Sequence, residues 1–190
     1  MKLCLLGGAG FIGANLQRAQ WKQGHELAVI DNLATGDRLN VMPGVAFYED
    51  DVVTLSAKAR QAVSEADVVY FLPALPAYKD IIADPQANLW IHSLGLLNVL
   101  RSTRDGATFI FASSSHIYGA SKWGDILDEE NTGNVHPLEP LGVYQEAKRF
   151  GEALVWTERK RLRVRIARIF NTYGPWSAKD GRVIESMINA

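Results

Sequence analysis

The sequence predicts an α/β fold built on a doubly wound parallel sheet, and three observations lead to it. Short apolar runs with β-rich composition alternate with helical patterns along the 190 residues. Several of these runs are apolar without alternation, which is typical of strands buried on both faces. A glycine-rich turn follows the first run and opens a helical pattern, as expected of a βαβ unit. We therefore expect one domain over residues 1–190.

Six strands and four main helices follow from this pattern. The strands are expected at Lys2 to Leu6, Leu27 to Ile30, Val45 to Tyr48, Asp67 to Leu72, Ala107 to Ala112 and Arg163 to Ile169. The helices are expected at about 11–22, 55–65, 84–104 and 144–160, with a further helix from Gly181 to Ala190. The segment from Ser113 to Val143 is long for a loop in a compact domain, and such loops are often functional.

Composition limits the classes of partner. A formal net charge of −1 gives no electrostatic footprint for nucleic acid or an acidic membrane surface. The one cysteine, Cys4, lies in the apolar run LCLL, which predicts a buried thiol and no internal disulfide. The apolar stretch before Gly7 is too short for a signal-peptide core or a membrane span. We expect a cytoplasmic protein that binds a small molecule, with no metal site.

The run Gly7-Gly8-Ala9-Gly10-Phe11-Ile12-Gly13 follows the first strand and opens the first helix. Glycines let the backbone turn tightly and approach a pyrophosphate, whose charge meets the free N–H groups at the helix N-terminus. The second strand ends near Asp31, where a carboxylate can accept hydrogen bonds from ribose hydroxyls. Together these features predict an NAD(P)-binding Rossmann fold. A carboxylate would repel a 2′-phosphate, so NAD is favoured over NADP.

A Tyr-x-x-x-Lys pair occurs twice, as Tyr118 with Lys122 and as Tyr144 with Lys148. The first pair lies in a short glycine-containing stretch, whereas the second opens a helical pattern in which residues i and i+4 share a face. An unperturbed tyrosine has a pKa of about 10, so a tyrosine base needs its phenolate stabilised. A lysine ammonium about 4 Å away would supply about 4 kcal/mol at an effective dielectric constant of about 20. We therefore expect Lys148 to lower the pKa of Tyr144.

At this point the chain resembles the extended short-chain dehydrogenase/reductases that act on nucleotide sugars. The matching phrases are GGAGFIG, DNLATG at 31–36, FASSSHIYG at 111–119, YQEAK at 144–148 and RIARIFNTYGP at 165–175. They run in the family's order over nearly the whole chain. The resemblance implies a nucleotide-sugar substrate carrying UDP or dTDP, NAD as cofactor, and transient hydride transfer at the sugar.

The resemblance also implies a set of site residues. The catalytic set is Ser114 as the serine, Tyr144 as the base and Lys148 as the ribose-binding lysine. Ser114, Ser115 and Asn171 would contact the substrate. The expected cofactor contacts are Gly7, Gly10, Phe11, Ile12, Gly13, Asp31, Asn32, Asp51, Val52 and Leu72, together with Tyr144 and Lys148.

Three departures from the family pattern affect the expected chemistry. Dehydratases carry an Asp-Glu pair after the catalytic threonine and sugar-acid decarboxylases a glutamate, whereas this chain has Ser115 and His116. Epimerisation, which needs only the serine, the tyrosine and the cofactor, is therefore favoured over elimination. Phe71 stands where the family usually has histidine, and His92 where it often has asparagine. The family's smaller C-terminal sugar-nucleotide domain is expected to be absent from these 190 residues.

Two alternatives stay open beside the epimerase. One is a noncatalytic NAD-binding module or truncated paralogue, favoured by the altered residues near the cofactor site. The other is a dehydratase or decarboxylase that uses His116 differently. A homodimer is also expected, because apolar residues surround the helix at Pro85 to Arg101 and so predict one face against the sheet and another against a partner.

Overall fold

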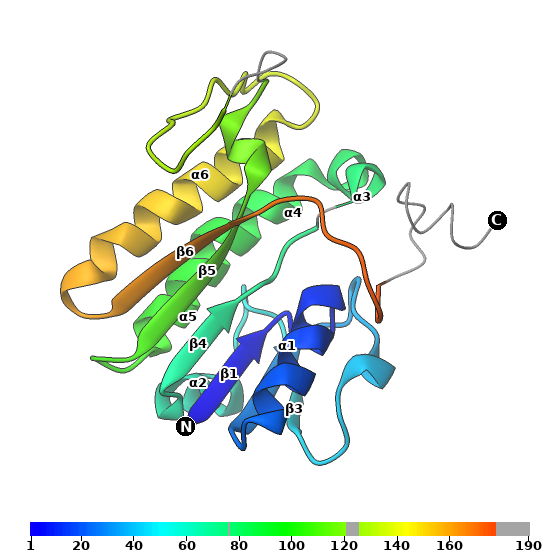
Figure 1. Ribbon diagram of the computed structural model, residues 1–190, viewed down its shortest axis with the longest axis vertical. Helices are drawn as coiled ribbons and strands as arrows, with labels where there is room; N and C mark the ends of the chain where they lie inside the picture. Colours follow the sequence, from blue (N-terminus) through cyan, green and yellow to red (C-terminus); the bar gives the residue numbers. More distant parts are fainter. Residues whose placement is uncertain (76, 121–125, 178–190) are drawn as a thin grey trace.

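A computed structural model describes residues 1–75, 77–120 and 126–177 of the chain. Its centre is a six-stranded, all-parallel sheet in the order β3-β2-β1-β4-β5-β6 (Figure 1). The strands are β1 (Lys2–Leu6), β2 (Glu26–Asp31), β3 (Ala46–Glu49), β4 (Val68–Phe71), β5 (Thr108–Ser114) and β6 (Arg163–Ile169). This strand order confirms the predicted doubly wound Rossmann fold.

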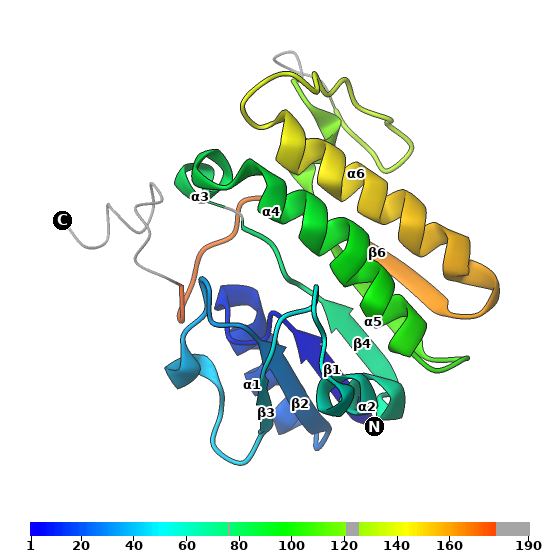
Figure 2. The same cartoon turned by 180° about the vertical axis from the view of Figure 1, so that it is seen from behind.

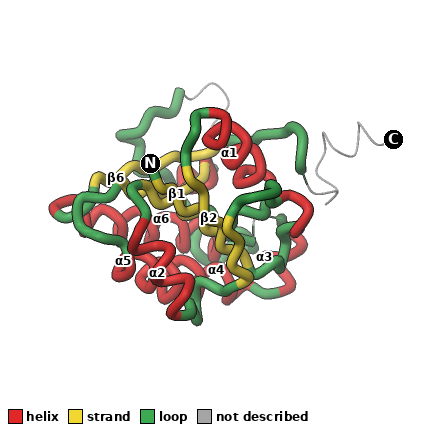
Figure 3. The backbone as a smooth tube through the Cα atoms, turned by 90° about the horizontal axis from the view of Figure 1, so that it is seen from below, coloured by secondary structure: helices red, strands yellow, loops and turns green. Residues whose placement is uncertain are grey.

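Helices cover both faces of the sheet. Figure 3 shows α1 on one face, and α2, α4, α5 and α6 on the other. Figure 2 looks onto the second face, where α4 and α5 run beside α6. The α-helices are α1 (Phe11–Lys22), α2 (Ala57–Glu65), α3 (Tyr78–Ala83), α4 (Pro85–Trp90), α5 (Leu96–Ser102) and α6 (Gly142–Thr157). The shorter turns are η1 (Arg38–Asn40), the π-helical η2 (Ile91–Gly95), η3 (Ser115–Tyr118) and η4 (Glu158–Lys160).

Two hydrophobic cores hold these layers together. The larger core joins the sheet to α2, α5 and α6 and includes three fully buried phenylalanines, Phe71, Phe109 and Phe111. The smaller core joins β1 and β2 to the α1 side and includes Leu5 and Val29. Strands buried on both faces explain why their sequences read as continuous apolar runs.

Several predicted boundaries differ from the structure. The strands β1 and β6 have the predicted ends, but the helix expected at 84–104 is three segments, α4, η2 and α5. Helix α3 was not predicted, because six residues are too few to show a helical period. The segment expected as one long loop begins with the end of β5 and the η3 turn. The helix expected from Gly181 to Ala190 lies outside the described residues, as does Lys122.

Within the three described ranges, no helix combines the length and apolar character needed to cross a membrane.

Candidate active site

The glycine turn between β1 and α1 brings two segments of backbone into close contact. A Cβ atom on Gly13 would lie 2.4 Å from the carbonyl oxygen of Gly8, and Gly7 has a φ of +71°. By contrast, a Cβ on Gly10 would have only the Gly7 oxygen within contact range, at 3.4 Å. Helix α1 begins at Phe11 with no side-chain cap, so its first N–H groups can serve an anion. This cradle fits a dinucleotide pyrophosphate.

Asp31 lies at the end of β2 beside this turn. One carboxylate oxygen accepts a hydrogen bond from the Ala9 N–H and the other from the Leu33 N–H, both at 2.8 Å. Burial raises the pKa of Asp31, and these two hydrogen bonds partly oppose the rise. A carboxylate offers about four acceptor positions, so Asp31 can still accept hydrogen bonds from a ribose.

Asn32 and Asp51 connect the ends of β2 and β3. The Asn32 side-chain amide donates to Asp51 Oδ2 at 2.7 Å, and Asp51 Oδ1 accepts from the Val53 N–H at 2.7 Å. This pair closes the edge of the site next to Asp31, where the resemblance implies adenine and ribose contacts.

Ser114, Tyr144 and Lys148 meet at the other end of the site. Ser114 is the last residue of β5, and its side-chain oxygen accepts from the His116 N–H at 3.2 Å. Tyr144 and Lys148 lie one turn apart on α6, and both are buried. The Lys148 ammonium donates to the carbonyl oxygen of Ala112 at 2.7 Å. The structure therefore places the predicted catalytic residues together.

The electrostatic expectation for this set was wrong. Burial raises the pKa of Tyr144, and the interaction with Ser114 only partly offsets that rise. Burial also lowers the pKa of Lys148 to about 7, and its Nζ atom lies 5.8 Å from the centroid of the Tyr144 ring. Desolvation, which the sequence-based argument left out, thus sets the direction of both pKa shifts, and Ser114 rather than Lys148 is the group that favours the phenolate.

The other candidate groups near this end have different surroundings. His116 lies edge-on to the Tyr144 ring, with the ring centroids 5.9 Å apart. Tyr118 instead is buried, and its hydroxyl accepts from Arg168 at 3.1 Å. Tyr118 therefore belongs to the packing of η3 rather than to the cleft.

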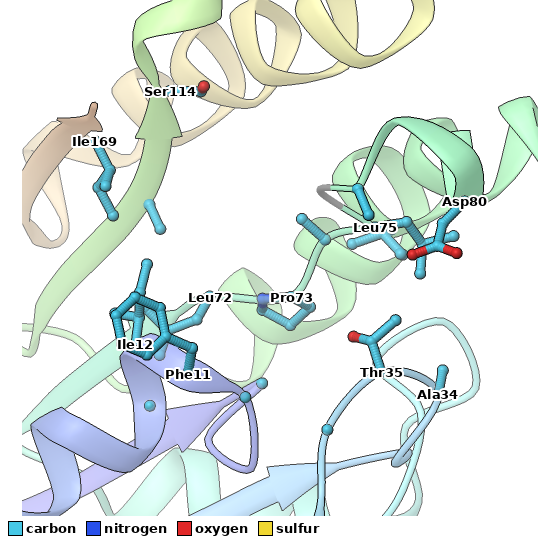
Figure 4. A pocket seen from close by; sticks show the side chains of 18 of the residues that line it. Phe11, Ile12, Ala34, Thr35, Leu72, Pro73, Leu75, Asp80, Ser114 and Ile169 are labelled. Carbon is cyan, nitrogen blue, oxygen red and sulfur yellow. The ribbon is translucent and has the colours of Figure 1, made fainter. Parts of the chain in front are cut away.

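A single cleft of about 820 Å³ joins the two ends of the site. It opens beyond the carboxyl ends of β1 and β4, where the strand order reverses, as expected for a doubly wound sheet. Figure 4 shows Phe11 and Ile12 below, Ser114 and Ile169 on one side, and Thr35 facing Asp80 on the other. The cleft is lined by all of the predicted cofactor and substrate residues: Gly7, Gly10, Phe11, Ile12, Gly13, Asp31, Asn32, Asp51, Val52, Leu72, Ser114, Ser115, Tyr144, Lys148 and Asn171.

Sequence reasoning missed part of the cleft wall. Pro73 and Leu75 follow β4, while Lys79 and Asp80 come from α3. Pro73 lies in the Phe71-Leu72-Pro73-Ala74 segment, whose departure from the family pattern is expected near the cofactor site. No motif marks Leu75, Lys79 or Asp80, and only the fold brings these three opposite Thr35. Thr35 itself lies within the phrase DNLATG, which could have identified it.

Phe71 and His92, the two departures expected near the cofactor site, lie beneath the cleft and contact each other. Their ring centroids are 6.2 Å apart, and both side chains are fully buried. The His92 Nδ1 atom lies 2.8 Å from the carbonyl oxygen of Asn88, and Nε2 has no hydrogen-bond partner among the described residues. Neither residue lines the cleft.

Comparisons with known proteins agree with this geometry. The model of the NAD dependent epimerase/dehydratase family matches residues 3–190. UDP-glucuronic acid decarboxylase 1 of Xenopus tropicalis is 32% identical over 98% of this chain and 45% of its own length. UDP-glucuronic acid decarboxylase 4 of Arabidopsis thaliana is 34% identical over 99% of this chain and 43% of its own length. This chain thus spans less than half of either relative.

Solved structures give the same result. A UDP-glucose 4-epimerase of Thermus thermophilus, in complex with NAD, is 30% identical and superposes with a TM-score of 0.80. The match covers 96% of this chain and 59% of that protein.

Proposed function

Because this chain belongs to the NAD-dependent epimerase/dehydratase family, as its motifs predicted, we propose that it forms the cofactor-binding half of a nucleotide-sugar epimerase. The family name confirms NAD as the predicted cofactor. One observation carries the proposal: Ser114, Tyr144 and Lys148 converge at one end of a cleft that has the glycine turn and Asp31 at the other. A UDP- or dTDP-linked sugar is the proposed substrate.

In this proposal each residue of the site has a separate role. Tyr144 removes the proton from a sugar hydroxyl, and Ser114 holds that hydroxyl and relays the proton. Lys148 holds the cofactor ribose. The glycine turn and Asp31 would hold NAD, which would supply reversible hydride acceptance at the sugar carbon that bears this hydroxyl, so that the configuration of that carbon could invert. Asn171 and Ser115 contact the sugar.

Replacing Tyr144 by phenylalanine tests the proposal. Turnover of UDP- or dTDP-sugars, followed by a coupled assay, should fall by about 10²-fold or more, because the proton acceptor is lost. Tyr48→Phe, on β3 and outside the cleft, is the matched control. A wild-type protein that binds no NAD by calorimetry would refute the proposal from its first step.

The second candidate is a decarboxylase of nucleotide-linked uronic acids. It is favoured by the names of the two relatives, both UDP-glucuronic acid decarboxylases. In this candidate His116, whose ring lies edge-on to Tyr144, would take the role of the glutamate that sugar-acid decarboxylases of the family carry. Incubation with UDP-glucuronate separates the candidates, since only a decarboxylase releases CO₂ and a nucleotide pentose.

We further propose that residues 1–190 on their own bind NAD but turn over sugars weakly. Holding the reacting carbon in place can lower a barrier by about 7–11 kcal/mol. The residues of the cleft supply the cofactor contacts, while a separate sugar-nucleotide domain would supply most of the grip on the substrate. Robust epimerisation by residues 1–190 would contradict this domain assignment. NAD binding without any turnover would favour the noncatalytic module.

NAD should bind more tightly than NADP. The Asp31 carboxylate accepts two backbone hydrogen bonds, and its negative charge would repel a 2′-phosphate. Arg38, the nearest cation in sequence, stacks on Phe47 with its guanidinium carbon 4.4 Å from the ring centroid. Calorimetric titration of both cofactors should give about a tenfold or larger preference for NAD, and Asp31→Asn should reduce it. Tighter binding of NADP would contradict the assignment.

The protein should form a homodimer through α4 and α6. These neighbouring helices and the η2 turn that continues α4 expose large apolar side chains to solvent. Leu89 and Trp90 on α4, Leu94 on η2, and Phe150 and Trp156 on α6 are each between 41% and 54% exposed. Such a patch is typical of an interface. Light scattering should therefore show a dimer at micromolar concentration, and Trp90→Glu a monomer. Trp21→Glu, which changes a tryptophan on α1 that is 43% exposed, should leave the dimer intact.

We also propose a cytoplasmic location. Cys4 is a free, fully buried thiol in β1, and burial raises its pKa to about 12. A protonated, buried cysteine of this kind is typical of a reducing compartment.

A further inference from the structure

A partly buried ion pair lies directly beside the candidate catalytic residues. Arg168 Nε and one terminal nitrogen donate to the two carboxylate oxygens of Glu152 at 3.0 and 2.9 Å. The two side chains are only 19% and 14% exposed. The Ser113 hydroxyl donates to the same carboxylate at 2.5 Å. The pair therefore fastens α6 to both β5 and β6.

Arg168 also fastens the turn that follows β5. Its remaining terminal nitrogen donates to the Tyr118 hydroxyl at 3.1 Å and to the carbonyl oxygen of Glu129 at 2.8 Å. Four of the five guanidinium N–H donors are thus in use. A lysine could not reproduce this set, because its ammonium lacks the planar fork.

Each anchor point is a neighbour of a candidate catalytic residue. Ser113 precedes Ser114 on β5 and is paired in the sheet with Arg168. Glu152 lies one helical turn after Lys148 and two turns after Tyr144 on α6, so the three residues share a face. Tyr118 ends the η3 turn that carries His116.

We infer that Arg168 and Glu152 are positioning residues: they fix β5, α6 and η3 relative to one another, and so hold the Ser114 hydroxyl against Tyr144. The inference rests on the proposed function, in which Tyr144 is the base. Loss of the anchor would let η3 move and would weaken the Ser114 contact that favours the phenolate. The cofactor end of the cleft shares none of these contacts.

A second arginine provides the matched control. Arg161, just before β6, donates to Glu158, Asp105 and the carbonyl oxygens of Thr103 and Leu100. It holds the opposite end of the same strand by a comparable network. Arg168→Lys and Arg161→Lys each remove an arginine hydrogen-bond network at one end of β6. Both keep the positive charge, so the comparison involves no change in net charge.

The experiment compares these variants in hydrogen exchange and in tyrosine titration by NMR. In Arg168→Lys, the amides of His116 in η3 and of Gly119 directly after η3 should exchange about tenfold faster or more. The acid dissociation constant of the Tyr144 phenol, assigned with Tyr144→Phe, should fall by about threefold. Arg161→Lys should leave both readouts unchanged even where it lowers thermal stability. If Arg168→Lys does not fold, Tyr118→Phe, which removes a single hydroxyl, should give the same changes in smaller measure.

Equal effects of the two lysine variants, or no effect of either, would overturn the inference and leave a purely structural ion pair. Neither readout needs NAD or a sugar. A wild-type protein that binds no NAD would therefore refute the proposed function separately, while the NMR comparison would still decide whether Arg168 positions Tyr144.

Discussion

Gly13→Ala is expected to abolish measurable NAD binding and to destabilise the fold. Alanine in a helix is normally favoured over glycine by about 1 kcal/mol, and Gly13 lies inside α1. Here the new methyl group would meet the Gly8 backbone at 2.4 Å, so the turn or the helix must move. Overpacking of this kind costs about 1–3 kcal/mol. Denaturant unfolding and calorimetry with NAD measure the two effects.

Gly10→Ala is the matched control for this prediction. Its methyl group would lie 3.4 Å from the Gly7 oxygen, so the fold should keep its stability within about 0.5 kcal/mol. The methyl group would project into the cleft, however, and NAD binding should weaken. The pair thus separates damage to the turn from obstruction of the pyrophosphate. Normal NAD binding by Gly13→Ala would contradict the assignment of this turn.

The features predicted well from the sequence are those that depend on local pattern. The runs of β1 and β6 are apolar or bounded by clear turns, so their ends were predicted correctly. The glycine turn and the spacing of Tyr144 and Lys148 carry their geometry in the sequence, because a helix places i and i+4 on one face. The glycine turn therefore predicted the pyrophosphate end of the cleft, and the Tyr144 and Lys148 pair predicted its catalytic end.

The features missed depend on tertiary contacts. The π-helical turn η2 has no sequence period of its own, and Gly95 within it packs against Val52 from a distant segment. The partnership of Glu152 with Arg168 depends on the register of β5 against β6, which no local pattern fixes. The predicted lowering of the Tyr144 pKa was also wrong, because the degree of burial follows from the assembled fold.

Lys148→Met is expected to raise the free energy of unfolding at acid pH and to lower it at alkaline pH. The pKa of Lys148 is lowered from 10.5 to about 7 in the folded protein. Between these values the unfolded chain binds a proton that the folded chain does not, so stability rises with pH across this window. Below pH 7 both states are protonated, and the full penalty of burying the charge is on the order of 5 kcal/mol.

Methionine removes this penalty but leaves the Ala112 carbonyl oxygen without its donor, which costs about 1–3 kcal/mol. At pH 6 the variant should therefore be more stable than the wild type by about 2–4 kcal/mol. Near pH 10 most of this penalty has gone, because the unfolded lysine is itself close to losing its proton, and the variant should be less stable. Guanidinium unfolding at pH 6, 7, 8.5 and 10 measures the difference, with the exposed Lys160→Met as control. A difference between Lys148→Met and wild type that stays constant with pH would show that Lys148 is not buried as an uncompensated charge.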